Sequence, residues 1–114
     1  MAKKKGKKTA SGIAAPSYAT LKAEAIEILD ENTDLALAAN YGAQYNAKTA
    51  LFKVLGIGPE RMWAMAPTVN KHLRKYPRFR PVTSAAMASC GKVAEFIVLY
   101  SEGANVAVPK GEPT

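Results

Sequence analysis

The first regular pattern of apolar residues begins just after residue 16. Tyr18, Leu21, Ala25 and Ile28 recur at steps of three or four residues, which predicts an amphipathic helix over residues 17–31. Four carboxylates of this segment are expected on its solvated face, where they are also available to hold the protein's own basic side chains: Glu24, Glu27, Asp30 and Glu31.

A second helix is predicted over residues 34–55. Thr33 or Asp34 is suited to cap its N-terminus, because a short polar side chain can accept a hydrogen bond from the first turn. The many alanines of this segment allow neighbouring helices to approach closely, so we expect it to lie centrally in the fold. Gly56 and Gly58 are expected to end it.

A further helical pattern starts at Pro59, a residue favoured in the first helical position. Pro67 interrupts this pattern, because proline lacks a backbone N–H and clashes with the preceding turn. The sequence therefore predicts either one kinked helix or two short helices, 59–66 and 67–76. Beyond them, Pro77 and Pro81 predict an extended segment.

The last apolar segment has two interpretations. Thr83 or Ser84 is expected to cap a helix, which either runs buried from 84 to 101 and stops at Gly103 or ends at Gly91. In the second case, the β-branched and aromatic residues that follow form a hairpin of 94–100 with 105–108. Periodicity does not separate the two readings in a run that is apolar on all sides, although we favour the helix.

These patterns predict a mainly α fold, a small bundle of four or five helices with a C-terminal β-hairpin over about 94–108 as the alternative. We expect residues 1–15 to form a flexible lysine-rich arm, 16–103 a single helical domain and 104–114 a loose tail. The composition, 48% hydrophobic and 22% charged over 114 residues, fits a folded chain. No apolar run approaches the roughly 20 residues of a membrane span, so we expect no membrane partner.

The residues that usually carry catalysis or bind metals are scarce. The single cysteine, Cys90, excludes an internal disulfide, and the single histidine, His72, has no partner at ligand spacing. We expect Cys90 to be a small buried hydrophobe. We expect the protein to lie in the cytoplasm or to be associated with nucleic acid, including inside a virion. No paired catalytic carboxylates, nucleophile motif or phosphate-binding glycine loop is present, so we expect neither an enzyme nor a cofactor or metal.

Positive charge is concentrated in two places. The formal net charge is +7, yet residues 16–57 carry three lysines against five acids. Residues 1–15 carry five lysines and no acid, and residues 58–82 carry six lysines and arginines against one acid. Charge of one sign gathered on one face attracts a polyanion, whereas an even scatter mainly aids solubility.

The two basic segments are the candidate nucleic-acid-binding site. The cations bind phosphate, and the two aromatic residues among them are suited to stack on unpaired bases. The candidate residues are Lys3, Lys4, Lys5, Lys7, Lys8, Lys71, Arg74, Lys75, Tyr76, Arg78, Phe79 and Arg80. The sequence thus predicts a non-enzymatic protein that binds DNA or RNA with strong dependence on salt and little selectivity for sequence.

Two alternatives stay open from the sequence. Tyr76 and Phe79 are equally consistent with core or hinge positions, with the cations covering a helix C-terminus where the helix dipole favours them. The whole chain is also consistent with a structural or inhibitory protein-interaction module of a virion or nucleoprotein assembly, with a protein partner or a second copy bound at Met62, Trp63 and Met65. Core packing is nevertheless the commoner role for such residues.

Overall fold

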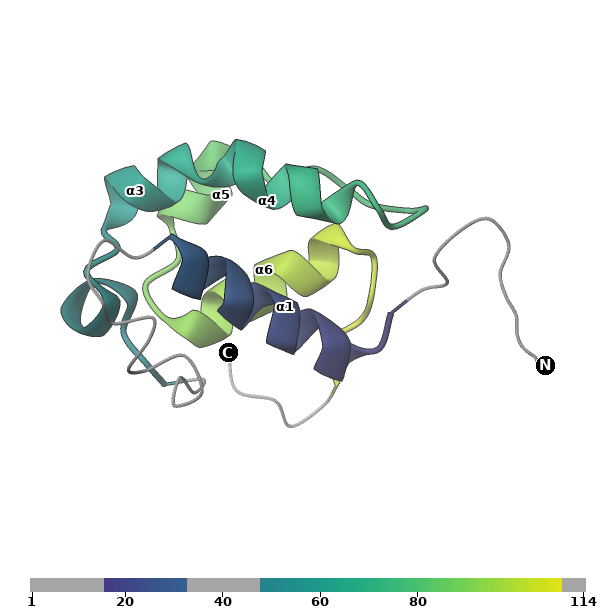
Figure 1. The fold of residues 1–114 in the computed structure, drawn as a ribbon, viewed down its shortest axis with the longest axis horizontal. Helices are drawn as coiled ribbons and strands as arrows, with labels where there is room; N and C mark the ends of the chain where they lie inside the picture. The colour runs from purple at the N-terminus through teal and green to yellow at the C-terminus, as the bar shows by residue number, and fades with distance from the viewer. Residues whose placement is uncertain (1–15, 33–47, 110–114) are drawn as a thin grey trace.

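The computed structural model describes residues 16–32 and 48–109. The predicted arm, residues 33–47 of the predicted second helix, and residues 110–114 lie outside the described part. The described part contains six helices, which confirms the predicted mainly α bundle (Figure 1): α1 Tyr18–Glu31, the π-helix η2 Leu51–Leu55, α3 Pro59–Ala64, α4 Ala66–Leu73, α5 Ser84–Ala88 and α6 Val93–Gly103.

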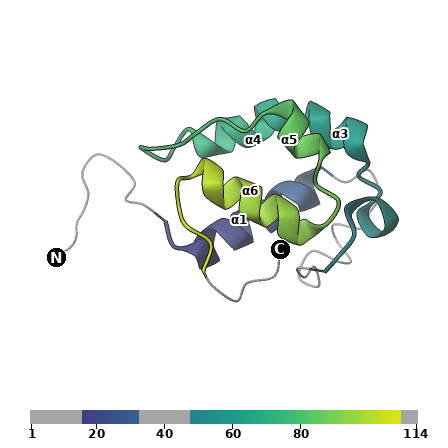
Figure 2. The same ribbon diagram turned by 180° about the vertical axis from the view of Figure 1, so that it is seen from behind.

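The helices form two layers around one core. Helices α3 and α4 follow one another along one side of the molecule, with α5 beside them (Figures 1 and 2). Helices α1 and α6 form the second layer, and the closest packing joins α1 to α6 and α3 to α5. Every helix contributes to the set of largest fully buried side chains, which includes Leu21, Ile28, Met62, Leu73, Met87, Phe96 and Tyr100.

Helix α1 forms as predicted. Ser17 has extended backbone angles, and its hydroxyl accepts a hydrogen bond from the Thr20 N–H at 3.1 Å, so it caps the helix. Leu21, Ala25 and Ile28 are buried, together with Leu29. The hydrophobic pattern therefore locates both the helix and its inward face.

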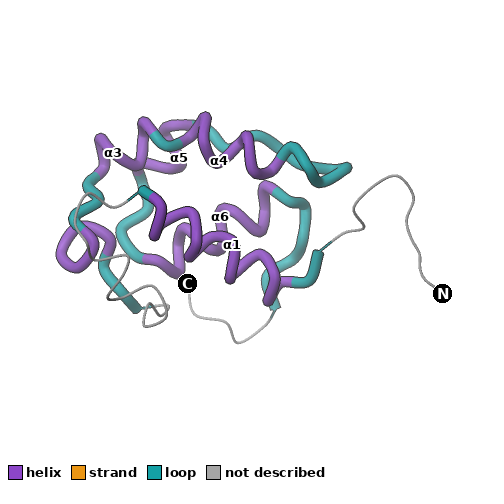
Figure 3. The backbone as a smooth tube through the Cα atoms, in the orientation of Figure 1, coloured by secondary structure: helices purple, strands orange, loops and turns teal. Residues whose placement is uncertain are grey.

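The predicted second helix does not run unbroken to residue 55. Residues 48–50 are not helical, because they pair with the segment before α6 (Figure 3). Leu51 N–H donates to the Gly91 carbonyl and Val93 N–H to the Thr49 carbonyl, each at 2.9 Å, around an isolated bridge between Ala50 and Lys92. One π-helical segment follows and ends at Gly56, whose φ of 73° lies in the left-handed region.

Two short helices form, as one of the two predictions had it, but they meet at Met65 and not at Pro67, and the second ends at Leu73 and not at residue 76. Met65 joins α3 to α4, and its angles of φ −82° and ψ −8° are helical, so the chain continues in the same direction. The Val69 N–H donates to the Met65 carbonyl at 3.0 Å. Pro67 lies in the first turn of α4, where a missing N–H is tolerated.

The favoured interpretation was right that residues 93–101 are helical and wrong that one helix runs from 84 to 101. Helix α5 ends at Ala88, before the predicted Gly91, and a second helix rather than a hairpin covers Val93–Gly103. Thr83 caps α5 by accepting from the Ala86 N–H. The Glu95 carboxylate accepts from the N–H groups just before α6, and these bonds stabilise a helix start in place of a strand.

Gly103 does not stop α6 by its conformation. The left-handed residue is Asn105, with φ 62°, and two hydrogen bonds close a Schellman motif around it: Val106 N–H to the Ser101 carbonyl and Asn105 N–H to the Glu102 carbonyl, each 3.0 Å. Ala104 is buried and Val106 packs against the core. The packed chain therefore extends past residue 103, where the sequence suggested a loose tail.

Gly103→Ala is expected to destabilise the fold, although alanine is the better helix former. A Cβ at this position would lie 2.6 Å from Leu73 Cδ1 and 3.2 Å from the Arg80 carbonyl oxygen. Leu73 is fully buried, so it has no free space to move into. Urea denaturation should show a loss of about 1–3 kcal/mol, the usual range for overpacking. Gly91→Ala is the control, because its Cβ would meet only Glu95 Oε1 at 3.5 Å. Equal stability of both variants would contradict this account.

Candidate nucleic-acid interface

The basic segment occupies the last turn of α4 and the loop that leads to α5. Two contacts fix this loop against the bundle. The Asn70 amide accepts from the Val82 N–H at 2.8 Å and donates to the Val82 carbonyl at 3.1 Å, and the Arg80 N–H donates to the Gly103 carbonyl at 2.6 Å. Both contacts hold the part of the loop that follows Arg78, one to α4 and the other to the end of α6.

One carboxylate, Glu24 of α1, organises the inner side of this loop. Glu24 accepts from the Tyr76 hydroxyl at 2.7 Å, from the Tyr100 hydroxyl at 2.6 Å and from Lys75 Nζ at 2.7 Å. Lys75 Nζ also lies 5.3 Å from the centre of the Tyr76 ring, within cation–π distance. These four residues, the Glu24 cluster, join α1, the end of α4 and α6.

The charge of Glu24 is stabilised by its partners. Burial on its own acts to raise the pKa of Glu24, but the hydrogen bonds from Lys75, Tyr100 and Tyr76 outweigh burial and lower the pKa. Burial and the neighbouring carboxylate both raise the pKa values of Tyr76 and Tyr100. At neutral pH the cluster is thus one carboxylate, one ammonium and two neutral phenols, so the charges of Glu24 and Lys75 cancel within the protein.

The expectation that Glu24 lies on a solvated face was wrong. Its side chain is only 20% exposed. Leu21, Ala25 and Ile28 surround position 24 at steps of three, one and four residues, so Glu24 lies within the buried stripe of α1. A carboxylate placed inside an apolar stripe was the signal in the sequence, because such a group requires donors from elsewhere in the fold.

The two aromatic residues of the basic segment pack toward the core, Tyr76 buried and Phe79 partly buried. Tyr76 is 3% exposed, and its hydroxyl is held by Glu24, so the ring presents no free face to a base. Phe79 is partly buried and packs against the core. Of the two roles left open by the sequence, core packing describes both rings in this conformation.

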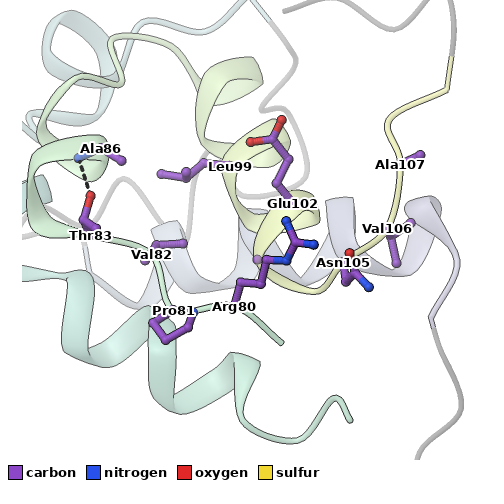
Figure 4. Close-up of a pocket in the computed structure, with 11 residues that line it drawn as sticks. Arg80, Pro81, Val82, Thr83, Ala86, Leu99, Glu102, Asn105, Val106 and Ala107 are labelled. Carbon is purple, nitrogen blue, oxygen red and sulfur yellow. Dashed lines mark hydrogen bonds between the residues drawn. The ribbon is translucent and has the colours of Figure 1, made fainter. Parts of the chain in front are cut away.

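The five cations of the segment fall into three groups. Lys75 is paired with Glu24. Arg80 lines an open groove of about 710 Å³ between the α4–α5 loop and the end of α6, and Glu102 of α6 lines the same groove (Figure 4). Lys71, Arg74 and Arg78 are exposed and form no ion pair with any described residue.

The lysine arm lies outside the described residues, as do all five of its candidate side chains. Its point of attachment is nevertheless visible, because the described chain begins at Pro16, immediately before α1. The N-terminal end of α1 and the loop after α4 lie at the same end of the long axis (Figures 1 and 2). The arm is therefore attached at the end of the molecule where the basic loop lies.

The residues of the predicted apolar cluster, Met62, Trp63 and Met65, differ in burial: the methionines are buried and the tryptophan is exposed. Met62, Met65 and Met87 are buried in the core, as expected. Trp63 is 55% exposed, so the expectation that it belongs to the core was wrong. The helical turn explains this: with Met62 facing inward, the next residue points about 100° away from it.

Cys90 is partly buried against the core, and burial, with the charge of Glu95, raises its pKa to about 11, so its thiol stays protonated. No group of three or more potential metal ligands gathers in residues 16–32 and 48–109. Over the same residues, no helix has the length and apolar character needed to cross a bilayer.

Comparison of the chain with protein-family models, with curated proteins and with solved structures finds no match. The assignment of function therefore depends on the geometry and charge of the residues described above.

Glu24→Gln is expected to lower the free energy of unfolding at pH 7 by about 2 kcal/mol, because a neutral amide loses the ion pair and weakens the charge-assisted bonds to both phenols. The pKa of Glu24 is lowered on folding, so its contribution is present above about pH 4.5 and is lost as the pH falls below that value. Urea denaturation from pH 7 to pH 3 should show the difference between wild type and variant shrinking. Glu27→Gln, an exposed site on the same helix, should change stability by less than about 0.5 kcal/mol at every pH.

Proposed function

We propose that this protein is a non-enzymatic nucleic-acid-binding protein that contacts phosphates through the outer cations of the α4–α5 region. The observation that supports this most directly is that neighbouring cations differ in whether a carboxylate of the protein pairs with them. Lys75 has a carboxylate partner, whereas Lys71, Arg74 and Arg78 project into solvent with no ion pair among the described residues. Exposed cations held on a fixed frame are suited to a phosphate backbone.

The spacing of these cations fits a polyanion. Lys71 and Arg74 lie three residues apart on one side of α4, so their positions differ by about 4.5 Å along the helix axis. Arg78 follows in the loop held by Asn70 and by the Arg80 backbone. The C-terminal end of a helix dipole also favours cations, which accounts for the first two but not for an arginine in the loop beyond.

The lysine arm is proposed to add contacts without reading the sequence. Lys8 is eight positions before Pro16 and Lys3 is thirteen, so at full extension the arm lysines reach between about 29 and about 47 Å from Pro16. That reach includes the basic loop at the same end of the molecule. Each lysine that neutralises a phosphate releases a condensed counterion, so the arm raises affinity at low salt in particular.

A second candidate function is protein interaction, favoured by the exposure of Phe52 at 68% and Trp63 at 55%. Large apolar side chains left in solvent are typical of contact surfaces. The version that used Met62 and Met65 as contacts loses those two residues, because both are buried. Light scattering distinguishes the candidates: a stable oligomer without nucleic acid supports protein interaction, whereas a monomer that shifts on adding DNA or RNA supports the proposal.

A double variant, Lys71→Gln with Arg74→Gln, is expected to weaken nucleic-acid binding by a similar factor for all sequences. Fluorescence polarisation of labelled DNA and RNA between 50 and 200 mM salt should show the slope of log K against log salt falling by about 2, or about 1 per lost contact.

The matched control removes the same charge elsewhere, with Lys53→Gln and Lys92→Gln, both exposed. It should change the slope much less. Binding that is absent at low salt in the wild type, or that falls equally in both double variants, would disprove a localised phosphate site.

A further inference from the structure

Helices α3 and α4 expose one continuous strip, the α3–α4 strip, on the side away from the core. The two helices follow one another without a change of direction at Met65 (Figures 1 and 2). At 100° per residue, the buried side chains of both helices fall on one side: Met62, Met65, Ala66, Val69 and Leu73. By the same geometry Trp63 and Arg74 lie about 100° and 120° from the buried side and Lys71 about 180° from it, and all three are exposed.

We propose that the α3–α4 strip binds single-stranded nucleic acid, with Trp63 stacking on an unpaired base and Lys71 and Arg74 contacting the backbone. This inference rests on the proposed function and specifies the kind of strand. An exposed aromatic ring in line with cations is the arrangement that single-strand binding proteins require, because bases stack on the ring while the cations follow the phosphates.

The dimensions of the strip agree with a short single strand. Trp63 and Arg74 are 11 residues apart, or about 17 Å along a helix. At about 3.4 Å per nucleotide for stacked bases this distance spans about five nucleotides, and fewer for an extended strand. A duplex keeps its bases paired and stacked inside, so the same ring would find no base face to contact.

The surroundings of Trp63 favour a base over a phosphate. The ring lines an apolar depression of about 250 Å³ together with Pro59, Glu60 and Ala88. The Glu60 carboxylate lies at the end of the strip away from the cations, where it repels phosphate but is able to accept hydrogen bonds from the amino groups of bases. Charge along the strip therefore directs the backbone toward Lys71 and Arg74 and leaves the depression to a neutral, flat group.

Trp63 is the only tryptophan of the chain, so its fluorescence reports directly on the proposed contact. Titration of the full chain with a single-stranded dT12 oligonucleotide is expected to quench this emission. In polarisation assays, Trp63→Ala should bind the same oligonucleotide about 5- to 100-fold more weakly. Trp63→Phe should keep most of the affinity, and binding of a 12-base-pair duplex should change less than twofold.

Phe52→Ala is the matched control, because Phe52 is an exposed aromatic residue on η2, outside the strip. It should leave both affinities unchanged. The ratio of wild-type to Trp63→Ala affinity should also stay constant as salt rises, since stacking releases no counterions, whereas the ratio for the Lys71→Gln and Arg74→Gln variant should shrink.

Three outcomes overturn the inference. Equal weakening of single-strand and duplex binding by Trp63→Ala would assign the ring a structural role. An unchanged single-strand affinity in Trp63→Ala, with the loss in the charge variant retained, would remove the stacking contact but keep the phosphate site. Emission that shifts with protein concentration in the absence of oligonucleotide, together with dimers in sedimentation, would instead make Trp63 a contact between copies of this chain.

Discussion

A carboxylate placed in the apolar stripe of α1 constrains much of this structure. Glu24 cannot remain charged there without donors, and the donors come from Tyr76 and Tyr100, which are 52 and 76 residues away along the chain. Because both phenols must reach the same carboxylate, the end of α4 and the middle of α6 are fixed relative to α1. A purely apolar contact would tolerate rotation or sliding of these helices, whereas hydrogen bonds to a charged group demand particular distances and angles.

The same constraint determines which cations are left for a partner. Lys75 completes the Glu24 cluster, so its charge is balanced within the protein. Turning Tyr76 inward places the helix positions on the other side, Lys71 and Arg74, toward solvent. The internal polar cluster and the outer basic surface are therefore two sides of one helix end. Among the described basic residues of α4 and its loop, Lys75 alone forms an ion pair with an acid of α1. If acids of α1 had neutralised all of these cations, the argument for a polyanion partner would have been lost.

Local signals in the sequence predict those elements whose ends are determined by neighbouring residues. Ser17 and Thr83 cap helices through their own hydroxyls, and Pro67 lies in the first turn of α4, where its missing N–H is tolerated. Long-range pairing was not predictable in this way. Residues 48–50 are not helical because they pair with residues 91–93, and the same pairing, with the bonds accepted by Glu95, separates α5 from α6. Hydrophobic periodicity carries no information about such partners, and it gave no reason to stop α5 at Ala88.

The misplacement of Trp63 has a different origin. Trp63 was grouped with Met62 and Met65 as one apolar cluster because core packing is the commoner role for such residues, although neighbouring residues of a helix point about 100° apart. Read as one helix through Pro67, the buried positions run from Met62 to Leu73 at steps of three, one, three and four residues, and Trp63 falls about 100° away from that side. The proline lies in the first turn of α4, where it removes a hydrogen bond without changing the direction of the chain. A large aromatic residue that the hydrophobic effect has not drawn into the core, in line with exposed cations, is explained most directly by contact with a partner.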